Sequence, residues 1–261
     1  MLEIKDLRVK FHNRNRYAVD GVSLKIQEGE IMGLVGESGS GKTVTAMSVA
    51  GLLPRRQCDY SGQILLDGRE LLHADRSILR TVQGKQIGVV FQEPMNAMDP
   101  LMKIGPQVEE TLKIHTDLKP KERKKLALEA LEAVELHNPE EVYGKYPHEL
   151  SGGMCQRTMI AAAIVSKPEL LLLDEPTTAL DITIQAQILE LLKKLNAEYR
   201  ISMLFISHDL NVVRKLCREV AVMQRGVIVE RGNTEEIFRN PEHDYTKKLI
   251  DAIPKRERRE D

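Results

Sequence analysis

The sequence predicts an α/β fold in which a buried parallel sheet is covered by helices. Short apolar runs alternate along the chain with amphipathic stretches, which is the pattern of parallel strands joined by crossover helices. We expect strands at residues 31–35, 87–91, 170–173, 203–206 and 220–223. The chain has 261 residues, 42% of them apolar, so it can bury the core that such a sheet requires.

Two regions depart from this alternation. Residues 2–11 and 19–26 alternate at period two, which predicts an antiparallel β layer before the parallel core. Charged, Ala- and Leu-rich segments replace the strand pattern between residues 103 and 166, for example at 121–134 after Pro120, and predict an inserted helical subdomain. We therefore expect a core of residues 1–92 and 167–232, a helical subdomain of residues 93–166 and a C-terminal helical segment of residues 233–261. Arg225-Gly226, between two β-like runs, is typical of a hairpin turn.

Composition excludes several classes of protein. A net charge of -1 from 38 basic and 39 acidic residues gives no reason to expect a nucleic-acid partner. Cys58, Cys155 and Cys217 lie far apart, which suits a reducing cytosol and gives no zinc or disulfide framework. The N-terminus has no secretory signal, and no apolar run approaches the ~18 residues of a membrane span. We expect any link to a membrane to come through a partner.

The first motif with chemical content is Gly-Glu-Ser-Gly-Ser-Gly-Lys-Thr at residues 36–43, the phosphate loop. It follows an expected strand and opens a helical stretch, as the G-x-x-x-x-G-K-[ST] motif requires. Its glycines let successive N–H groups converge on phosphate oxygens, and the helix N-terminus adds a partial positive charge. We expect Lys42 to reach the β and γ phosphates and Thr43 to bind Mg²⁺. The residues expected to contact the nucleotide here are Gly36, Glu37, Ser38, Gly39, Ser40, Gly41, Lys42, Thr43 and Thr45.

The second motif is the pair Asp174-Glu175 at the end of the apolar run Leu170-Leu171-Leu172-Leu173. Successive side chains of a strand point in opposite directions, so the two acids have different roles. Asp174 is expected to hold, through water, the Mg²⁺ bound by Thr43, and Glu175 to polarise the attacking water as general base.

With Gln92, Leu150-Ser151-Gly152-Gly153 and His208, these motifs follow an order that resembles the nucleotide-binding subunits of ABC transporters over essentially the whole chain. The resemblance implies a RecA-like P-loop ATPase core that binds ATP and Mg²⁺. It implies that Gln92 senses the γ-phosphate and Mg²⁺, that His208 contacts the γ-phosphate, and that Asp181 in Ala179-Leu180-Asp181 contacts the opposite subunit's site. The implied catalytic residues are Lys42, Gln92, Glu175 and His208, and the implied metal-binding residues are Thr43, Gln92 and Asp174.

Residues 151–153 begin an expected helix through residues 154–165 and offer a second anion site. One chain already has a phosphate loop. The resemblance therefore implies that Ser151, Gly152 and Gly153 bind the γ-phosphate of an ATP held by a partner subunit, which makes ATP the link of a dimer.

An aromatic side chain before the phosphate loop is expected to stack on the adenine base. The candidates are Phe11 and Tyr17. Phe11 ends the first expected strand, the position that the family usually uses, so we favour it over Tyr17.

Two features resemble the importers of oligopeptides, dipeptides and nickel within that family. Met154 stands where many relatives have Gln, and residues 240–249 resemble the Pro-x-His-x-Tyr-Thr-x-x-Leu segment near the C-terminus of these ATPases. With no cysteine after Cys217, the chain resembles the short members, which serve either peptides or nickel and metallophores. For Cys155 we expect ordinary packing, because no base that could activate its thiol lies nearby in sequence.

The resemblance implies a cytosolic subunit at the membrane face that pairs with a second ATPase, a paralogue or a copy of itself, and with two membrane permease subunits. Residues 92–110 are expected to receive a coupling helix of the permease, and an external binding protein would choose the substrate. The alternatives are an exporter subunit or a soluble ABC-type ATPase of translation or DNA repair. A GTPase would want an Asn-Lys-x-Asp motif, which the sequence lacks.

Overall fold

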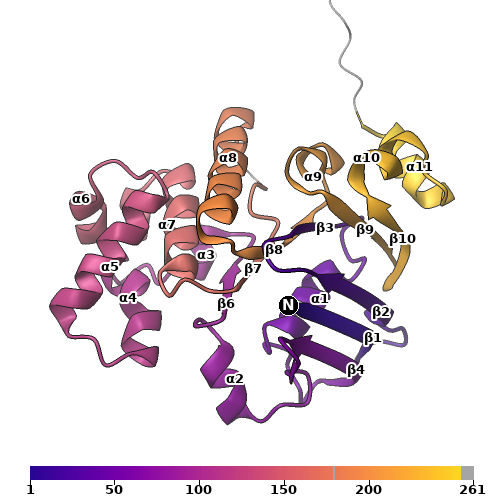
Figure 1. The fold of residues 1–261 in the computed structure, drawn as a ribbon, viewed down its shortest axis with the longest axis horizontal. Helices are drawn as coiled ribbons and strands as arrows, with labels where there is room; N and C mark the ends of the chain where they lie inside the picture. The colour runs from indigo at the N-terminus through magenta and orange to yellow at the C-terminus, as the bar shows by residue number, and fades with distance from the viewer. Residues whose placement is uncertain (179, 254–261) are drawn as a thin grey trace, which may run out of the picture.

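The structure is a computed structural model that describes residues 1–178 and 180–253, and it contains two β-sheets with helices around and between them (Figure 1). Two features named from the sequence lie outside the described residues, Ala179 of the Ala-Leu-Asp loop and the tail of residues 254–261. The predicted α/β class is confirmed by the order of the elements.

The central sheet has six strands in the order β10-β9-β3-β8-β7-β6. Its strands are β3 (Ile31–Val35), β6 (Ile87–Val90), β7 (Leu170–Asp174), β8 (Ser202–Ser207), β9 (Glu219–Gln224) and β10 (Val227–Asn233). All neighbours pair in parallel except β10, which is antiparallel to β9. The five strands predicted for this sheet are present, each end within one residue of its expected place. Arg225 and Gly226 have φ of 49° and 90°, so the predicted hairpin turn between β9 and β10 is also confirmed.

The two faces of the central sheet are buried in different apolar clusters. Leu34 of β3 and Leu172 of β7 face a cluster shared with the N-terminal sheet. Their chain neighbours Val35 and Leu171 face a cluster shared with the helices. Burial on both faces explains why these strands are continuous apolar runs rather than alternating ones.

The N-terminal sheet is antiparallel, with strands in the order β2-β1-β4-β5, as predicted for its first two members. Its strands are β1 (Leu2–Phe11), β2 (Val19–Ile26), β4 (Cys58–Leu66) and β5 (Arg69–Glu70). Helix α1 (Lys42–Val49) packs in the cluster between the two sheets through Ala46 and Val49. A further short helix, α2 (Arg76–Val82), precedes β6.

Residues 91–169, all of which the structure describes, contain helices and no strand. These are α3 (Pro94–Ala97), α4 (Ile104–His115), α5 (Pro120–Ala133), α6 (Pro139–Gly144), a 3₁₀ helix (Pro147–Glu149) and α7 (Gly152–Ile164). Helices α4 to α7 gather beyond the β6 edge of the central sheet (Figure 1). Ile104, Leu131 and Ile160 share one buried cluster with Phe205 of β8, so the helices and the sheet have a continuous core. The division into a separate subdomain stays a prediction.

The remaining helices are α8 (Ile182–Tyr199), α9 (Leu210–Leu216), α10 (Thr234–Arg239) and α11 (Asp244–Asp251). Helices α10 and α11 lie at the end of the molecule away from α4 to α7, beside β9 and β10 (Figure 1). Within residues 1–178 and 180–253, none of these helices has the length and apolar character needed to cross a membrane.

Candidate nucleotide site

The phosphate loop connects β3 to α1 and forms the floor of a cavity of about 690 Å³. Two of its glycines are required by close backbone contacts. A Cβ on Gly36 would lie 2.1 Å from the Met223 carbonyl oxygen, and one on Gly41 would lie 2.4 Å from the Ala18 carbonyl oxygen. Gly41 also has a φ of 109°, which a residue with a side chain rarely adopts. The cavity is lined by Arg14, Ala18, Gly36, Glu37, Ser38, Gly39, Gly41, Lys42, Thr43, Val44, Gln92, Glu175, Thr178, His208 and Leu249.

The amides of the phosphate loop are free to bind an anion. Within the described part of the chain, the N–H groups of Gly39, Gly41, Lys42 and Thr43 have no hydrogen-bond acceptor. The first N–H groups of a helix have no partner inside the helix and carry a partial positive charge. The loop therefore offers several convergent donors, which fits a polyphosphate.

Lys42 supplies the positive charge of the site. Its ammonium donates to the carbonyl oxygens of Gly36 at 2.7 Å and Glu37 at 3.0 Å, and it lies 4.0 Å from Oε1 of Glu175. Burial lowers the pKa of Lys42, an effect that the carboxylates of Glu175 and Asp174 oppose. These carboxylates keep a charged ammonium in a buried position, where a phosphate would find it partly desolvated.

Thr43 and Asp174 meet as the sequence predicts. The Thr43 hydroxyl donates to Oδ1 of Asp174 at 3.1 Å, although 131 positions separate the two residues. Burial raises the pKa of Asp174, and the Thr43 hydrogen bond lowers it in part. A hydroxyl and a carboxylate are hard oxygen donors of the kind that Mg²⁺ prefers, and phosphate oxygens would complete the set, so these residues fit Mg²⁺.

Glu175 is the centre of the hydrogen-bond network in the cavity. Its Oε2 accepts from Gln92 Nε2 at 3.2 Å and from Thr178 Oγ1 at 2.9 Å, and lies 3.0 Å from His208 Nδ1. Its φ of 49° is unusual for a residue with a side chain and turns the chain as β7 ends. The structure thus brings together Lys42, Gln92, Glu175 and His208, the four residues predicted to be catalytic.

Some predicted nucleotide-binding residues lie elsewhere. Thr45 is fully buried and its hydroxyl donates to the Gly41 carbonyl oxygen at 3.0 Å, so this side chain is not directed at a nucleotide. Ser40 is also buried, and its carbonyl oxygen accepts from the Gly226 N–H at 2.9 Å. Phe11 is partly buried against the N-terminal sheet, whereas Tyr17 is 46% exposed beside the cavity residue Ala18. Neither ring lines the cavity, and the choice between them stays a prediction.

The segment Ser151-Gly152-Gly153 begins α7, as predicted, but does not line the cavity of its own chain. The Ser151 side chain caps the helix by accepting from the Met154 N–H at 3.3 Å, while Ser151 and Gly152 are exposed. Asp181 likewise caps α8, since its Oδ1 accepts from the Ile184 N–H at 2.9 Å.

Cys155 is a packing residue, as expected. Its thiol is fully buried, 3.2 Å from Met95 Sδ and 3.4 Å from the Pro147 carbonyl oxygen. Burial raises the pKa of Cys155, so the thiol is protonated and unreactive near neutral pH.

Sequence reasoning missed five cavity residues, Arg14, Ala18, Val44, Thr178 and Leu249. Thr178 lies three positions after Glu175, so a hydroxyl so close to the predicted base was a signal that could have found it. Arg14 follows the first strand and had no signal. Leu249 comes from α11, which the sequence did not connect with the phosphate loop.

Comparisons with known proteins give the family of the chain. The ABC transporter family matches residues 19–178, and the family described as "Oligopeptide/dipeptide transporter, C-terminal region" matches residues 229–261. The chain belongs to the ABC transporter ATP-binding family and is an ATPase of that class.

Individual relatives give the same result. The chain is 44% identical to the oligopeptide transport ATP-binding protein OppD of Bacillus subtilis, over 97% of this chain and 72% of OppD. It is 48% identical to the peptidoglycan transport ATP-binding protein YejF of Agrobacterium fabrum over 98% of this chain, but it spans only 48% of the length of YejF. The solved ATP-binding cassette MJ0796, a dimer bound to ADP and Pi after hydrolysis, superposes with a TM-score of 0.79 at 30% identity, over 90% of this chain and 99% of that one.

Proposed function

We propose that this chain is the ATP-hydrolysing subunit of an importer that brings peptides across the cytoplasmic membrane. The observation that carries the proposal is the C-terminal region. Residues 229–261 match the oligopeptide/dipeptide transporter family, and they include His243, Tyr245 and Thr246 of the segment noted in the sequence. The description of this family names oligopeptide and dipeptide transport, which favours a peptide importer over an exporter or a soluble ATPase.

The residues of the cavity have separate tasks in the proposed reaction. Thr43, Gln92 and Asp174 would hold Mg²⁺, which neutralises charge on the phosphate oxygens when bound. Lys42 and the loop amides would orient the β and γ phosphates. Glu175, oriented by Gln92 and His208, would accept a proton from the attacking water.

The second anion site would act on a neighbouring subunit. Ser151, Gly152 and Gly153 lie outside their own chain's cavity at the start of a 13-residue helix, and within the described residues their N–H groups have no hydrogen-bond acceptor. We place them on the γ-phosphate of an ATP bound by a second ATPase subunit, a copy or a paralogue. Binding would close this dimer and hydrolysis would open it. The dimeric MJ0796 cassette supports the proposal.

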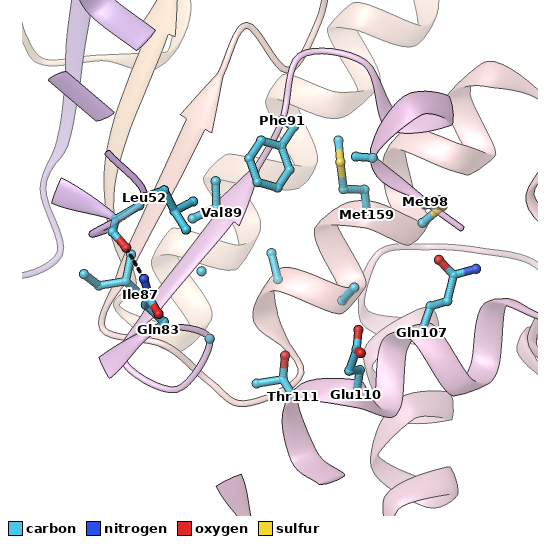
Figure 2. Close-up of a pocket in the computed structure, with 16 residues that line it drawn as sticks. Leu52, Gln83, Ile87, Val89, Phe91, Met98, Gln107, Glu110, Thr111 and Met159 are labelled. Atoms are coloured by element: carbon cyan, nitrogen blue, oxygen red, sulfur yellow. Dashed lines mark hydrogen bonds between the residues drawn. The ribbon is translucent and has the colours of Figure 1, made fainter. Parts of the chain in front are cut away.

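A cleft between the sheet and the helices would receive the permease. The cleft has a volume of about 340 Å³ and lies between β6 on one side and α4 and α7 on the other (Figure 2). Val89, Phe91 and Met159 give it apolar walls, and Gln107 and Glu110 of α4 line the opposite side (Figure 2). Leu101, 88% exposed, lies in the segment next to it. An apolar cleft with a few polar groups suits a short amphipathic helix, so residues 92–110 would dock a coupling helix of one permease subunit.

The proposal predicts which solute depends on this chain. In a strain lacking the gene, uptake of a radiolabelled oligopeptide should be lost and should return with the wild-type gene but not with Glu175→Gln. Uptake of radioactive nickel should be unchanged. Loss of nickel uptake alone would assign the chain to the metal importers of the same group, and normal uptake of both would contradict the proposal. An external binding protein would deliver the peptide.

A further inference from the structure

The C-terminal helix α11 is fixed to the central sheet by hydrogen bonds at its start. The Glu230 carboxylate of β10 accepts from the N–H groups of Glu242 at 2.8 Å and His243 at 3.1 Å. Burial alone would raise the pKa of Glu230, but these two bonds, together with Thr246 and the His243 side chain, lower it and keep the carboxylate ionised. His243 then caps the helix, because its Nδ1 accepts from the Tyr245 N–H at 3.1 Å. The position of α11 is therefore well defined.

From this position α11 contacts the phosphate loop. The hydroxyl oxygen of Tyr245 accepts a hydrogen bond from the Glu37 N–H at 2.9 Å, across 208 positions of sequence. Tyr245 is only 6% exposed, so little water is available to replace this bond. Leu249 lies one helical turn further along the same face and lines the phosphate cavity.

We propose that α11 is part of the nucleotide site, with Tyr245 as a positioning residue for the phosphate loop and Leu249 as part of the cavity wall. Glu37 is the second residue of the loop and lies two residues before Gly39, whose amide is free to bind an anion. A loop anchored at its start loses less conformational freedom when it closes on a triphosphate, which favours binding. The tether therefore acts on nucleotide affinity rather than on proton transfer, because no hydrogen bond within the described residues joins Tyr245 to the Glu175 network.

The test compares two tyrosines. Tyr245→Phe removes only the hydroxyl. Tyr143→Phe is the matched control, because it removes a tyrosine hydroxyl that donates to Glu109, away from the cavity. We expect Tyr245→Phe to raise the Kd for ATP about fivefold, the effect of one hydrogen bond, with kcat at saturating ATP within about twofold of wild type. Tyr143→Phe should leave the Kd unchanged. An unchanged Kd in Tyr245→Phe, or an equal rise in both variants, would overturn the proposal.

A measurement on the wild-type chain removes any dependence on how the variants fold. Coupling between two sites is reciprocal, so ATP must stabilise the docked position of α11 by the same factor by which the tether favours ATP. We expect saturating ATP, with EDTA to prevent hydrolysis, to slow amide hydrogen exchange in residues 245–251 about fivefold. Exchange in α11 that ATP does not change would contradict the coupling. The binding and exchange measurements use the chain alone, and kcat is measured on the assembled ATPase dimer, so no outcome depends on which solute the importer carries.

Discussion

Two helices of this molecule, α1 and α7, begin with amides that can bind phosphate, and the surroundings of these two helix starts are opposite. The start of α1 is enclosed, because Lys42 is 4% exposed, two carboxylates lie beside it and a cavity of about 690 Å³ opens above it. The start of α7 is exposed and is capped by its own Ser151 side chain. The start of α1 therefore has the groups that we propose for hydrolysis, namely a cation, oxygen ligands suited to Mg²⁺ and a general base. The start of α7 has exposed amides without such groups, which is why we propose that it completes a site on another molecule.

The largest expected effect concerns Glu175, the proposed general base in the cavity at the start of α1. Glu175→Gln keeps the shape of the side chain and a hydrogen-bonding oxygen but removes the proton acceptor. We expect hydrolysis to fall by about 10²- to 10⁴-fold with ATP affinity retained, and the ATP-bound dimer to accumulate. Single-turnover hydrolysis and gel filtration with ATP measure the two effects. Glu190→Gln, on the exposed face of α8, is the control. Hydrolysis near the wild-type rate would remove Glu175 as the base.

The next effect separates metal binding from folding stability at Asp174, which is hydrogen-bonded to the cavity residue Thr43. We expect Asp174→Asn to lower Mg²⁺-dependent hydrolysis by about 10- to 100-fold, as for other residues that orient a metal through water. Without nucleotide or metal, the same change should raise the thermal midpoint at pH 7. Burial raises the pKa of Asp174 in the folded chain, so the ionised carboxylate destabilises the fold above the titration range of an ordinary aspartate.

The stability gain should therefore disappear as pH falls below about 4, where the carboxyl group is protonated in both the folded and unfolded chain. Asp117→Asn, on an exposed loop, is the control for the change of charge. A thermal midpoint that is lower than that of wild type at pH 7 would show that the Thr43 hydrogen bond and Lys42 outweigh burial.

The smallest effect concerns the adenine ring of ATP. Phe11→Ala should weaken ATP binding by about 1 kcal/mol, or about fivefold, through loss of ring stacking, while Tyr17→Ala should change it less. Equilibrium binding well below the thermal midpoint measures both, because Phe11 also packs on the N-terminal sheet. An unchanged Kd in Phe11→Ala with a raised Kd in Tyr17→Ala would reverse the preference.

The two helix starts also differ in how much of their function the sequence could predict. The site at the start of α1 could be predicted because each of its parts is a short sequence motif. These are an apolar strand, a glycine loop with Lys42, and an acid pair where β7 ends. The direction of Thr45 was not predicted, although a threonine four residues after Gly41 can donate back to that carbonyl group. Strand β4 was missed because its polar, half-exposed residues give no clean alternation.

The contact between α11 and the phosphate loop could not be predicted from the sequence. The hydrogen bond between Tyr245 and Glu37 depends on the position that α11 takes after β10, and no local sequence pattern predicts that position. The motif around His243 and Tyr245 was visible in the sequence, but only the structure gives its physical role. The proposed role of Ser151 involves an ATP bound by another subunit, so its test needs the assembled dimer.

The most direct test of the composite site is Ser151→Arg, measured as ATP affinity of the separate chain and as hydrolysis by the assembled dimer. A large cation at the start of α7 would obstruct the neighbour's phosphate but lies outside the cavity of its own chain. We predict an unchanged Kd for ATP in the separate chain, with loss of hydrolysis in the dimer and of the ATP-dependent dimer in the Glu175→Gln background. A loss confined to the chain's own ATP affinity would contradict the account.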